Sequence, residues 1–248
     1  MTSAVSSSPF AAPIDLPSKS IDDIAADPVL VVAPHPDDET LGCGGAIALL
    51  RDRNITVRVL VMSDGTRSHP NSRKYPSPDL KKLRESETRS AMSILGVDDI
   101  DFLGLPDGDV PMQDAPEANE AIDRCQAILA SIAPKVIFLP WRYDPHPDHR
   151  ATWQLLHRAS VNLSPQPRSI EYAIWDWDEA QRREIPSAQD VSVWRLDIST
   201  VLSSKKQAIA AYRSQTTDLI DDDPQGFRLL PEFLANFQRP WEVYLEVK

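Results

Sequence analysis

Two short motifs hold the residues of this sequence that could do chemistry, HPDD at residues 35–38 and DPHPDH at residues 144–149. Together they offer three imidazoles and several carboxylates. Two or three imidazoles with one carboxylate, and one coordination position left open, form the ligand set of a hydrolytic zinc site. Such an ion lowers the pKa of bound water to roughly 7 and polarises a carbonyl oxygen. The motifs therefore predict a metal-dependent hydrolase.

Only some of these side chains can bind the metal, because four protein ligands would close the site to water. We expect Asp38 to bind the metal and its neighbour Asp37 to do proton chemistry on the water. One of the two histidines of the second motif, His146 or His149, completes the metal site. The other is then free to meet the oxyanion or to protonate the leaving group.

Each motif lies where an apolar strand gives way to a helix. Residues 29–32 (VLVV) and 136–139 (VIFL) are short apolar runs typical of parallel strands covered on both faces. Helical patterns follow at 40–53 and 151–160. Because right-handed crossovers place the strand-to-helix junctions of a parallel sheet at one edge, the two motifs can meet in space.

A purely structural explanation exists for each motif taken alone. A His-Pro-Asp sequence is usually a turn, because Pro and Asp are turn residues in their own right. An acidic pair after a strand is often only the N-terminus of a helix, where the helix dipole stabilises carboxylates. The same pattern at two strand-to-helix junctions favours the metal site.

On these residues the sequence resembles the PIG-L/LmbE-like deacetylases, whose signatures are His-Pro-Asp-Asp after the first strand and His-x-x-His or His-Pro-Asp-His more than a hundred residues later. The resemblance implies a Rossmann-like fold and zinc-dependent removal of an acetyl group from an N-acetylglucosamine-type sugar. It implies a set of metal ligands, namely His35, Asp38 and His149. It also implies that Asp37 is the general base, that His146 stabilises the oxyanion or acts as an acid, and that Asp148 orients His146.

The resemblance extends to positions outside the two motifs. Members of the family use an arginine after the second strand to hold substrate, which Arg67 matches, and they brace the site with an arginine and a glutamate, here Arg84 and Glu85. A tyrosine near the second motif often assists the oxyanion. Tyr143 has a different spacing from that residue, and Tyr212 stands where histidine is frequent, so the sequence assigns neither of them a role.

Several residues after other strands are candidates for substrate contacts. Arg67 lies in a polar stretch, residues 63–79, and either donates hydrogen bonds to a sugar or is a solvated loop residue. Asp107 either accepts hydrogen bonds from sugar hydroxyls or forms only an Asx turn. Trp175 or Trp177 either stacks on a sugar ring or packs in the core. His69 is expected to be exposed.

The remaining pattern predicts one α/β domain with a doubly wound, mostly parallel sheet flanked by helices and with additional C-terminal strands. Further strands are expected at 56–62, 100–105, 169–177, 191–197 and 241–247, the last as an edge strand. Further helices are expected at 79–95, 117–132 and 200–212, and the charges of the first are expected to face solvent. Residues 1–20 are expected to form a flexible tail without a secretory signal, and 21–248 the deacetylase domain. An acidic loop at 218–226 either caps the site or lies apart from it.

Composition and charge exclude several classes of partner. The chain has 248 residues, which suits one α/β domain, and a formal charge of −11, which argues against nucleic acid and against an anionic membrane surface. No apolar run approaches the ~20 residues of a membrane span. Two cysteines provide no disulfide framework, so a cytoplasmic location is expected. The oligomeric state is not readable from the sequence.

We therefore expect a deacetylase that acts on a small-molecule N-acetylated amino sugar or glycoconjugate. Zn²⁺ is the expected ion, and a His₂Asp set also accepts Fe²⁺ or Co²⁺. One alternative is a hydrolase of another sugar-linked amide conjugate. A second alternative, from a different class, is a metal-holding carbohydrate-binding protein without catalysis.

Overall fold

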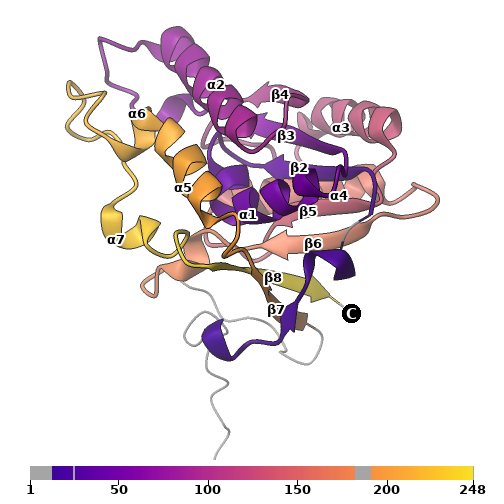
Figure 1. The fold of residues 1–248 in the computed structure, drawn as a ribbon. Coiled ribbons are helices and arrows are strands. Elements are labelled where there is room, and N and C mark those ends of the chain that lie inside the picture. Colours follow the sequence, from indigo (N-terminus) through magenta and orange to yellow (C-terminus); the bar gives the residue numbers. More distant parts are fainter. Residues whose placement is uncertain (1–12, 25, 182–190, 248) are drawn as a thin grey trace, which may run out of the picture.

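Eight strands of the described residues form one sheet in the computed structural model, which describes residues 13–24, 26–181 and 191–247 (Figure 1). The strands are β1 (Ser18–Lys19), β2 (Val29–Ala33), β3 (Val57–Ser63), β4 (Ile100–Leu105), β5 (Val136–Pro140), β6 (Arg168–Tyr172), β7 (Val191–Asp197) and β8 (Trp241–Val247). Their order across the sheet is β1-β7-β8-β6-β5-β2-β3-β4. Only β8 runs antiparallel to its neighbours. The predicted mostly parallel α/β fold is confirmed.

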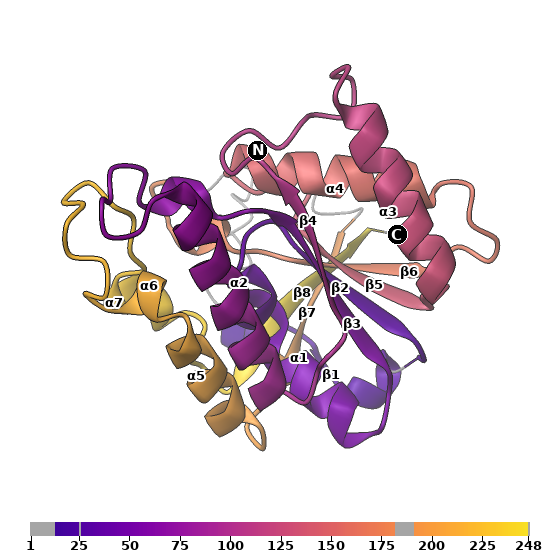
Figure 2. The same cartoon turned by 90° about the horizontal axis from the view of Figure 1, so that it is seen from above.

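The helices cover both faces of this sheet. They are α1 (Asp38–Asp52), α2 (Ser77–Ile94), α3 (Ala118–Ile132), α4 (Pro147–Ser160), α5 (Leu202–Ala211), α6 (Arg213–Thr216) and α7 (Pro231–Leu234). Figure 2 shows α1, α2 and α5 on one face and α3 and α4 on the other. Each face has its own apolar core, because alternate residues of β2 point to opposite sides: Val31 packs beneath the first group and Val32 beneath the second.

Strand β8 lies inside the sheet, between β7 and β6, so the prediction of an edge strand was wrong. Its polar residues suggested an exposed edge, but they are paired within the fold. Glu242 is buried and accepts hydrogen bonds from the backbone amides of Gly45 and Ala46 in α1 and from Lys205 in α5. A carboxylate with such partners can occupy a central strand.

The expected strand at 169–177 ends early. Strand β6 stops at Tyr172, and Trp175–Trp177 form a 3-10 turn instead. The cause is Asp144, whose Oδ2 accepts hydrogen bonds from the backbone amides of Ile174, at 3.2 Å, and of Trp175, at 3.1 Å. The chain after β6 therefore turns towards the second motif.

The charges of α2 are divided between solvent and interior, which corrects the prediction of a wholly solvated charged face. Arg84 and Glu87 are buried. Glu85 is only partly buried and lies 4.0 Å from Lys81, one turn earlier. Of the two glutamates, it is Glu87 that makes buried hydrogen bonds to another element, accepting from the backbone amide and the hydroxyl of Ser214 in α6.

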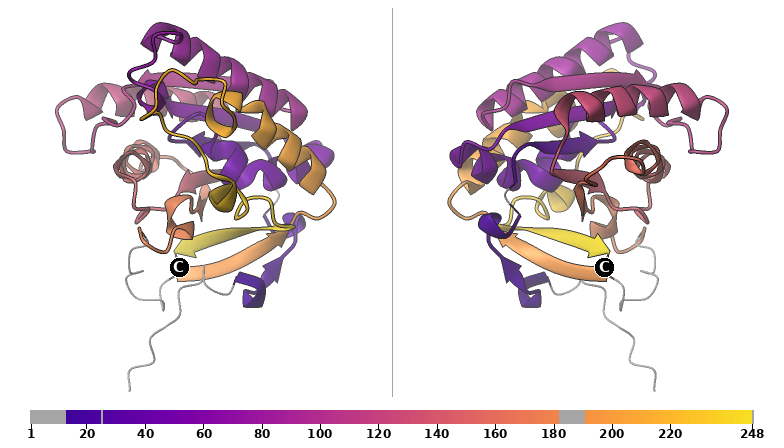
Figure 3. Two further views of the ribbon diagram at one scale, coloured as in Figure 1. Left: turned by 90° about the vertical axis from the view of Figure 1, so that its left-hand side faces the viewer. Right: turned by 90° about the vertical axis from the view of Figure 1, so that its right-hand side faces the viewer.

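Part of the expected N-terminal tail is ordered in the sheet. Ser18 and Lys19 form β1, which pairs in parallel with β7, and Figure 3 shows this segment lying along the edge of the sheet. Residues 1–12 lie outside the described residues. Among the helices that the structure describes, none combines the length and the apolar character needed to cross a bilayer.

Candidate metal centre and active site

The two motifs meet at the carboxyl edge of the sheet because β2 and β5 are parallel neighbours. The first motif joins β2 to α1, and the second joins β5 to α4, so both strand ends present their polar residues on the same side. His35, Asp37, Asp38 and His146 line one cavity there, of about 570 Å³. The expected meeting of residues more than a hundred positions apart is confirmed.

Asp38 lies between two imidazoles. Its Oδ2 atom is 3.1 Å from Nδ1 of His35 and 3.2 Å from Nε2 of His149. The Nε2 atom of His149 is fully buried, and this contact lacks the geometry of a hydrogen bond. Imidazole nitrogens and a carboxylate oxygen are the donor types of a zinc-type site. Among the described residues, the groups whose ligand atoms all lie within 4.8 Å of one another are His35, His146 and His149, and His35, Asp107 and Asp148. The assignment of His35, Asp38 and His149 as the metal ligands stays a prediction.

A second carboxylate supports the ring of His149 from behind. Oδ2 of Asp144 is 3.4 Å from Nδ1 of His149. Burial disfavours a charged imidazole. The negative charges of Asp144 and Asp38 outweigh the effect of burial and raise the pKa of His149 to about 9. This position thus favours positive charge, as expected for a cation site. Asp144 had no predicted role, although its place two residues before His146 in the same motif is a sequence signal.

The carboxylate of Asp148 contacts His35. Its Oδ2 is 3.1 Å from Nε2 of His35 and accepts a hydrogen bond from the amide of Gly108, at 2.7 Å. A carboxylate on the outer nitrogen of a ligand histidine fixes the tautomer and the ring orientation. Asp148 reaches the ring of His146 through its backbone amide, which donates to Nδ1 at 3.2 Å. The predicted orienting role towards His146 stays a prediction that rests on this amide.

Asp107 joins the same cluster. Its Oδ1 is 3.3 Å from Nε2 of His35, and its Oδ2 accepts a hydrogen bond from the backbone amide of Arg67, at 2.7 Å. Burial opposes the charge, but the hydrogen bond with His35 outweighs burial and lowers the pKa of Asp107 to about 2. Asp107 therefore carries a negative charge at neutral pH. Its side chain contacts the imidazole of His35 and the backbone amide of Arg67.

Asp37 is held in an unusual conformation beside Arg84. Its φ of 128° is strained for a residue with a side chain, and such strain often occurs at functional sites. The guanidinium of Arg84 lies 3.3 Å from Oδ2 of Asp37 and also donates to the carbonyl oxygens of Pro36 and Gly65. Burial raises the pKa of Asp37 well above its usual range even though Arg84 opposes the shift. A carboxyl group of this kind can take up and release a proton.

A buried hydrogen-bonded chain supports the backbone of Asp37 from the other side. The amide of Asp37 donates to Oε2 of Glu39, at 3.2 Å, and the hydroxyl of Tyr212 donates to Oε1 of the same carboxylate. Tyr212 is buried and does not line the cavity. Tyr212 is thus connected to the backbone of Asp37 through the carboxylate of Glu39.

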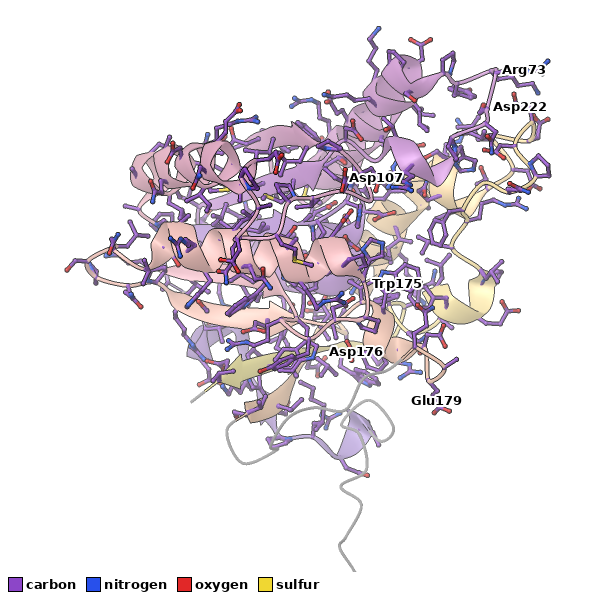
Figure 4. The ribbon with its side chains drawn as sticks, turned by 180° about the vertical axis from the view of Figure 1, so that it is seen from behind. Arg73, Asp107, Trp175, Asp176, Glu179 and Asp222 are labelled. Atoms are coloured by element: carbon purple, nitrogen blue, oxygen red, sulfur yellow. The ribbon has the colours of Figure 1, made fainter. Side chains whose placement is uncertain are left out.

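The cavity is lined by both polar and apolar residues. Arg67, Asp107 and Gln215 are among the polar ones, and Trp175, Phe227 and Leu229 are among the apolar ones. Figure 4 shows Asp107 and Trp175 on the same side of the molecule. The predicted candidates Arg67 and Asp107 are therefore at the site.

The aromatic candidates differ in whether they line the cavity. The ring of Trp175 is stacked 6.2 Å from that of His146 and 5.0 Å from that of Phe233, measured between centroids. Trp177 packs against Trp241, away from the cavity lining. The ring of Tyr143 lies 5.2 Å from that of Trp141 and is not part of the lining either. Only Trp175 of these three reaches the cavity.

The acidic loop is attached to the polar stretch after β3. Asp222 accepts hydrogen bonds from Ser72 and from the backbone amides of Arg73 and Lys74, and Figure 4 shows Arg73 and Asp222 on adjoining loops. Behind this contact His69 is only 2% exposed, so the prediction of an exposed His69 was wrong. The long-range loop contact buries it, and no local sequence pattern indicates such a contact.

Comparison with known proteins agrees with this geometry. The family model described as PIG-L, GlcNAc-PI de-N-acetylase, matches residues 30–160, which is more than half of the chain. A Bacillus subtilis (strain 168) protein named probable N-acetyl-alpha-D-glucosaminyl L-malate deacetylase 2 is 31% identical over 198 residues, covering 77% of this chain and 85% of that protein.

Two further similar proteins are named as diacetylchitobiose deacetylases. The diacetylchitobiose deacetylase of Thermococcus kodakarensis is 33% identical over 202 residues, covering 75% of this chain and 69% of that protein. The solved structure of N,N′-diacetylchitobiose deacetylase from Pyrococcus horikoshii, complexed with its inhibitor MPG, is similar with a TM-score of 0.62 and 26% identity. That match covers 79% of this chain and 73% of the other. The chain therefore belongs to the PIG-L family, the GlcNAc-PI de-N-acetylases.

Proposed function

We propose that the chain is a metal-dependent N-deacetylase that hydrolyses the acetamide group of an N-acetylglucosamine-type amino sugar or glycoconjugate. The observation that carries the proposal is the contact of Asp38 with His35 and His149, next to a cavity that His35, Asp38 and the buried carboxyl group of Asp37 line. The names of the relatives, which include deacetylases of a glucosaminyl malate and of diacetylchitobiose, support the substrate class.

The predicted ligands His35, Asp38 and His149 would hold the ion. Zn²⁺ is the ion that we expect, and Fe²⁺ or Co²⁺ also suits these donors. The bound ion would lower the pKa of a water molecule and polarise the acetyl carbonyl group. Asp148 would then fix the tautomer of His35, since its carboxylate accepts a hydrogen bond from the N–H at Nε2 and leaves Nδ1 for the ion.

Asp37 is the group that transfers the proton. In its ionised form it takes a proton from the attacking water, and it then gives that proton to the amine nitrogen as the C–N bond breaks. Arg84 holds the carboxylate in place through its contacts with Asp37 and with the carbonyl of Pro36. The products are acetate and the free amino sugar.

We infer that His146 stabilises the oxyanion. Burial and the neighbouring imidazole of His149 lower the pKa of His146 to about 4, so the ring is neutral at pH 7. Because Nδ1 accepts a hydrogen bond from the amide of Asp148, the proton of the neutral ring is on Nε2. This N–H can donate to the oxyanion that forms on the acetyl group.

The test is acetate release from a panel of N-acetylglucosamine derivatives, measured with the protein as purified, after chelation and after Zn²⁺ is restored. The panel contains the free sugar, diacetylchitobiose, and malate and inositol glycosides. We expect release that disappears on chelation and returns with the ion. Release that persists in a metal-free protein would contradict the metal-dependent mechanism. No release from any member, with one ion bound per chain, would favour another amide substrate or a binding protein.

A further inference from the structure

Gln215 contributes a buried carboxamide to the wall of the cavity that holds His35 and Asp37. The residue lies in α6 and is fully buried. Its backbone is fixed on both sides: its amide donates to the carbonyl of Tyr212, and its carbonyl accepts from the amide of Leu229, at 2.8 Å. Nothing in the proposed mechanism uses this side chain.

The neighbours of Gln215 determine which way its amide points. The hydroxyl of Ser214 donates its proton to Oε2 of Glu87, at 2.6 Å, so it can only accept from Gln215. The atom of Gln215 that lies 2.9 Å from this hydroxyl must therefore be the donor, Nε2. The same nitrogen lies 3.4 Å from the hydroxyl of Ser68. A flipped amide would place two acceptors against each other at Ser214.

This arrangement leaves Oε1 of Gln215 without a partner. The atom is buried and makes no hydrogen bond within the described residues. An acceptor left unpaired in the interior costs about 1–3 kcal/mol, so such atoms in native proteins are few and call for an explanation. The side chain of Gln215 lines the cavity, so a molecule bound in that cavity can supply the missing donor.

We propose that Gln215 is a substrate-binding residue whose Oε1 accepts a hydrogen bond from a hydroxyl group or from the acetamide N–H of the amino sugar. The inference rests on the proposed function and adds a contact that sets substrate orientation and specificity. A site with a buried acceptor discriminates against analogues that lack the donor, because the acceptor then stays unpaired. Ser214 and Glu87 are the positioning residues for this contact.

The first test compares the wild-type protein with Gln215→Leu, which keeps the size of the side chain but removes its polar atoms. With the best substrate of the panel we expect kcat/KM to fall about 10–100-fold, with metal content unchanged. Gln215→Met is a second, more flexible replacement in case the leucine variant does not fold. The melting temperature and bound metal of each variant are measured alongside.

The donor is identified with substrate analogues. Removing the responsible hydroxyl should lower kcat/KM for the wild type and have little effect in Gln215→Leu. If every deoxy analogue affects both proteins alike, an ester analogue with oxygen in place of the acetamide nitrogen tests the N–H in the same way. An analogue set that never distinguishes the two proteins would overturn the assignment.

Ser214→Ala is the matched control for amide orientation, because it keeps Gln215 and removes the hydroxyl that fixes Nε2. We expect a smaller loss than in Gln215→Leu, and we expect the double variant to resemble Gln215→Leu alone. Fully additive losses would mean that Ser214 does not act through Gln215.

The outcomes separate this inference from the proposed function. If the wild type releases acetate and both folded Gln215 variants keep kcat/KM within twofold, the inference is wrong and the proposed function stands. If the wild type releases no acetate, the proposed function fails, and calorimetric binding of intact N-acetylglucosamine and diacetylchitobiose decides the inference. Weaker binding to Gln215→Leu then supports it, whereas equal binding or none overturns it.

Discussion

Asp37 and Asp38 are adjacent acids with opposite electrostatic environments. The imidazoles of His149 and His35 outweigh burial and hold the pKa of Asp38 well below its usual range. Burial raises the pKa of Asp37, and the neighbouring carboxylate of Asp38 adds to the shift. Two neighbouring carboxyl groups thus divide into a permanent anion suited to a cation and a group suited to exchanging protons.

Replacing Asp37 should separate metal binding from turnover. We expect Asp37→Asn to keep the wild-type metal content and to lose about 10²–10⁴-fold in kcat, because an amide cannot take the proton of the water. Metal analysis and acetate release on the same preparation measure the two effects. Asp109→Asn, at an exposed aspartate, is the control. An Asp37→Asn variant with near wild-type kcat would exclude Asp37 as the base.

Asp148 offers a test of which histidine it serves. Asp148→Ala removes the carboxylate that contacts His35 and keeps the backbone amide that donates to His146. We expect metal affinity to fall about 10–100-fold, measured by competition with a chelator, because the ligand tautomer is no longer fixed. Asp114→Ala, at an exposed aspartate, controls for the loss of charge. Unchanged affinity with reduced kcat would instead indicate that the carboxylate acts on His146.

At the scale of elements, α1 is the helix that carries the first motif, and it packs closely on the sheet. A side chain at Gly42 would come within 2.2 Å of the ring of Tyr172 in β6, so only glycine permits this approach. Further along the helix, Glu242 of β8 bridges the amides of Gly45 and Ala46 to the ammonium group of Lys205 in α5. One buried carboxylate thus connects β8, α1 and α5.

This connection should be important for stability. Lys205 is 1% exposed, and removal of one partner of a buried ion pair leaves the other charge unpaired in the interior. We expect Glu242→Gln to lower the free energy of unfolding by about 3–5 kcal/mol, measured by urea denaturation. The double variant with Lys205→Met should recover part of the loss, because it removes the unpaired cation. A loss no larger than that of Glu120→Gln, at an exposed glutamate, would contradict this role.

At the scale of the whole molecule, Glu246 joins separate parts of the sheet. Its carboxylate in β8 accepts hydrogen bonds from Lys19 of β1, Arg168 of β6 and Trp194 of β7. Burial opposes the charge, but the bonds from Arg168 and Lys19 outweigh it and lower the pKa of Glu246 from 4.5 to about 2. Glu246 thus adds side-chain contacts that connect β8 to β1, β6 and β7 beside the backbone pairing of the sheet.

The depressed pKa of Glu246 predicts an acid-dependent loss of stability. A group whose pKa is lower in the folded state stabilises the fold fully above its unfolded pKa and loses that contribution as the pH falls. The free energy of unfolding of the wild type should therefore exceed that of Glu246→Gln at pH 7, and the difference should shrink between about pH 4.5 and about pH 2. Urea denaturation across this range measures it. A difference independent of pH would mean that the charge of Glu246 does not contribute.

The sequence by itself determined the parts of this protein that depend on local pattern. The apolar runs of β2 and β5 and the motifs after them were sufficient to predict the parallel sheet, the edge where the site lies and the meeting of the two motifs there. The choice of His149 over His146 as a ligand came from the family resemblance. Periodicity and turn chemistry are properties of neighbouring residues, so they are readable along the chain.

Only the tertiary structure decided what distant elements do to a side chain. The central place of β8, the burial of His69 and the role of Glu87 instead of Glu85 each depend on partners from other segments. The unpaired acceptor of Gln215 is of the same kind, since Ser214 and Glu87 together fix its amide. Burial and hydrogen-bond partners across the fold set the charge, exposure and orientation of a polar residue, and a one-dimensional pattern does not contain them.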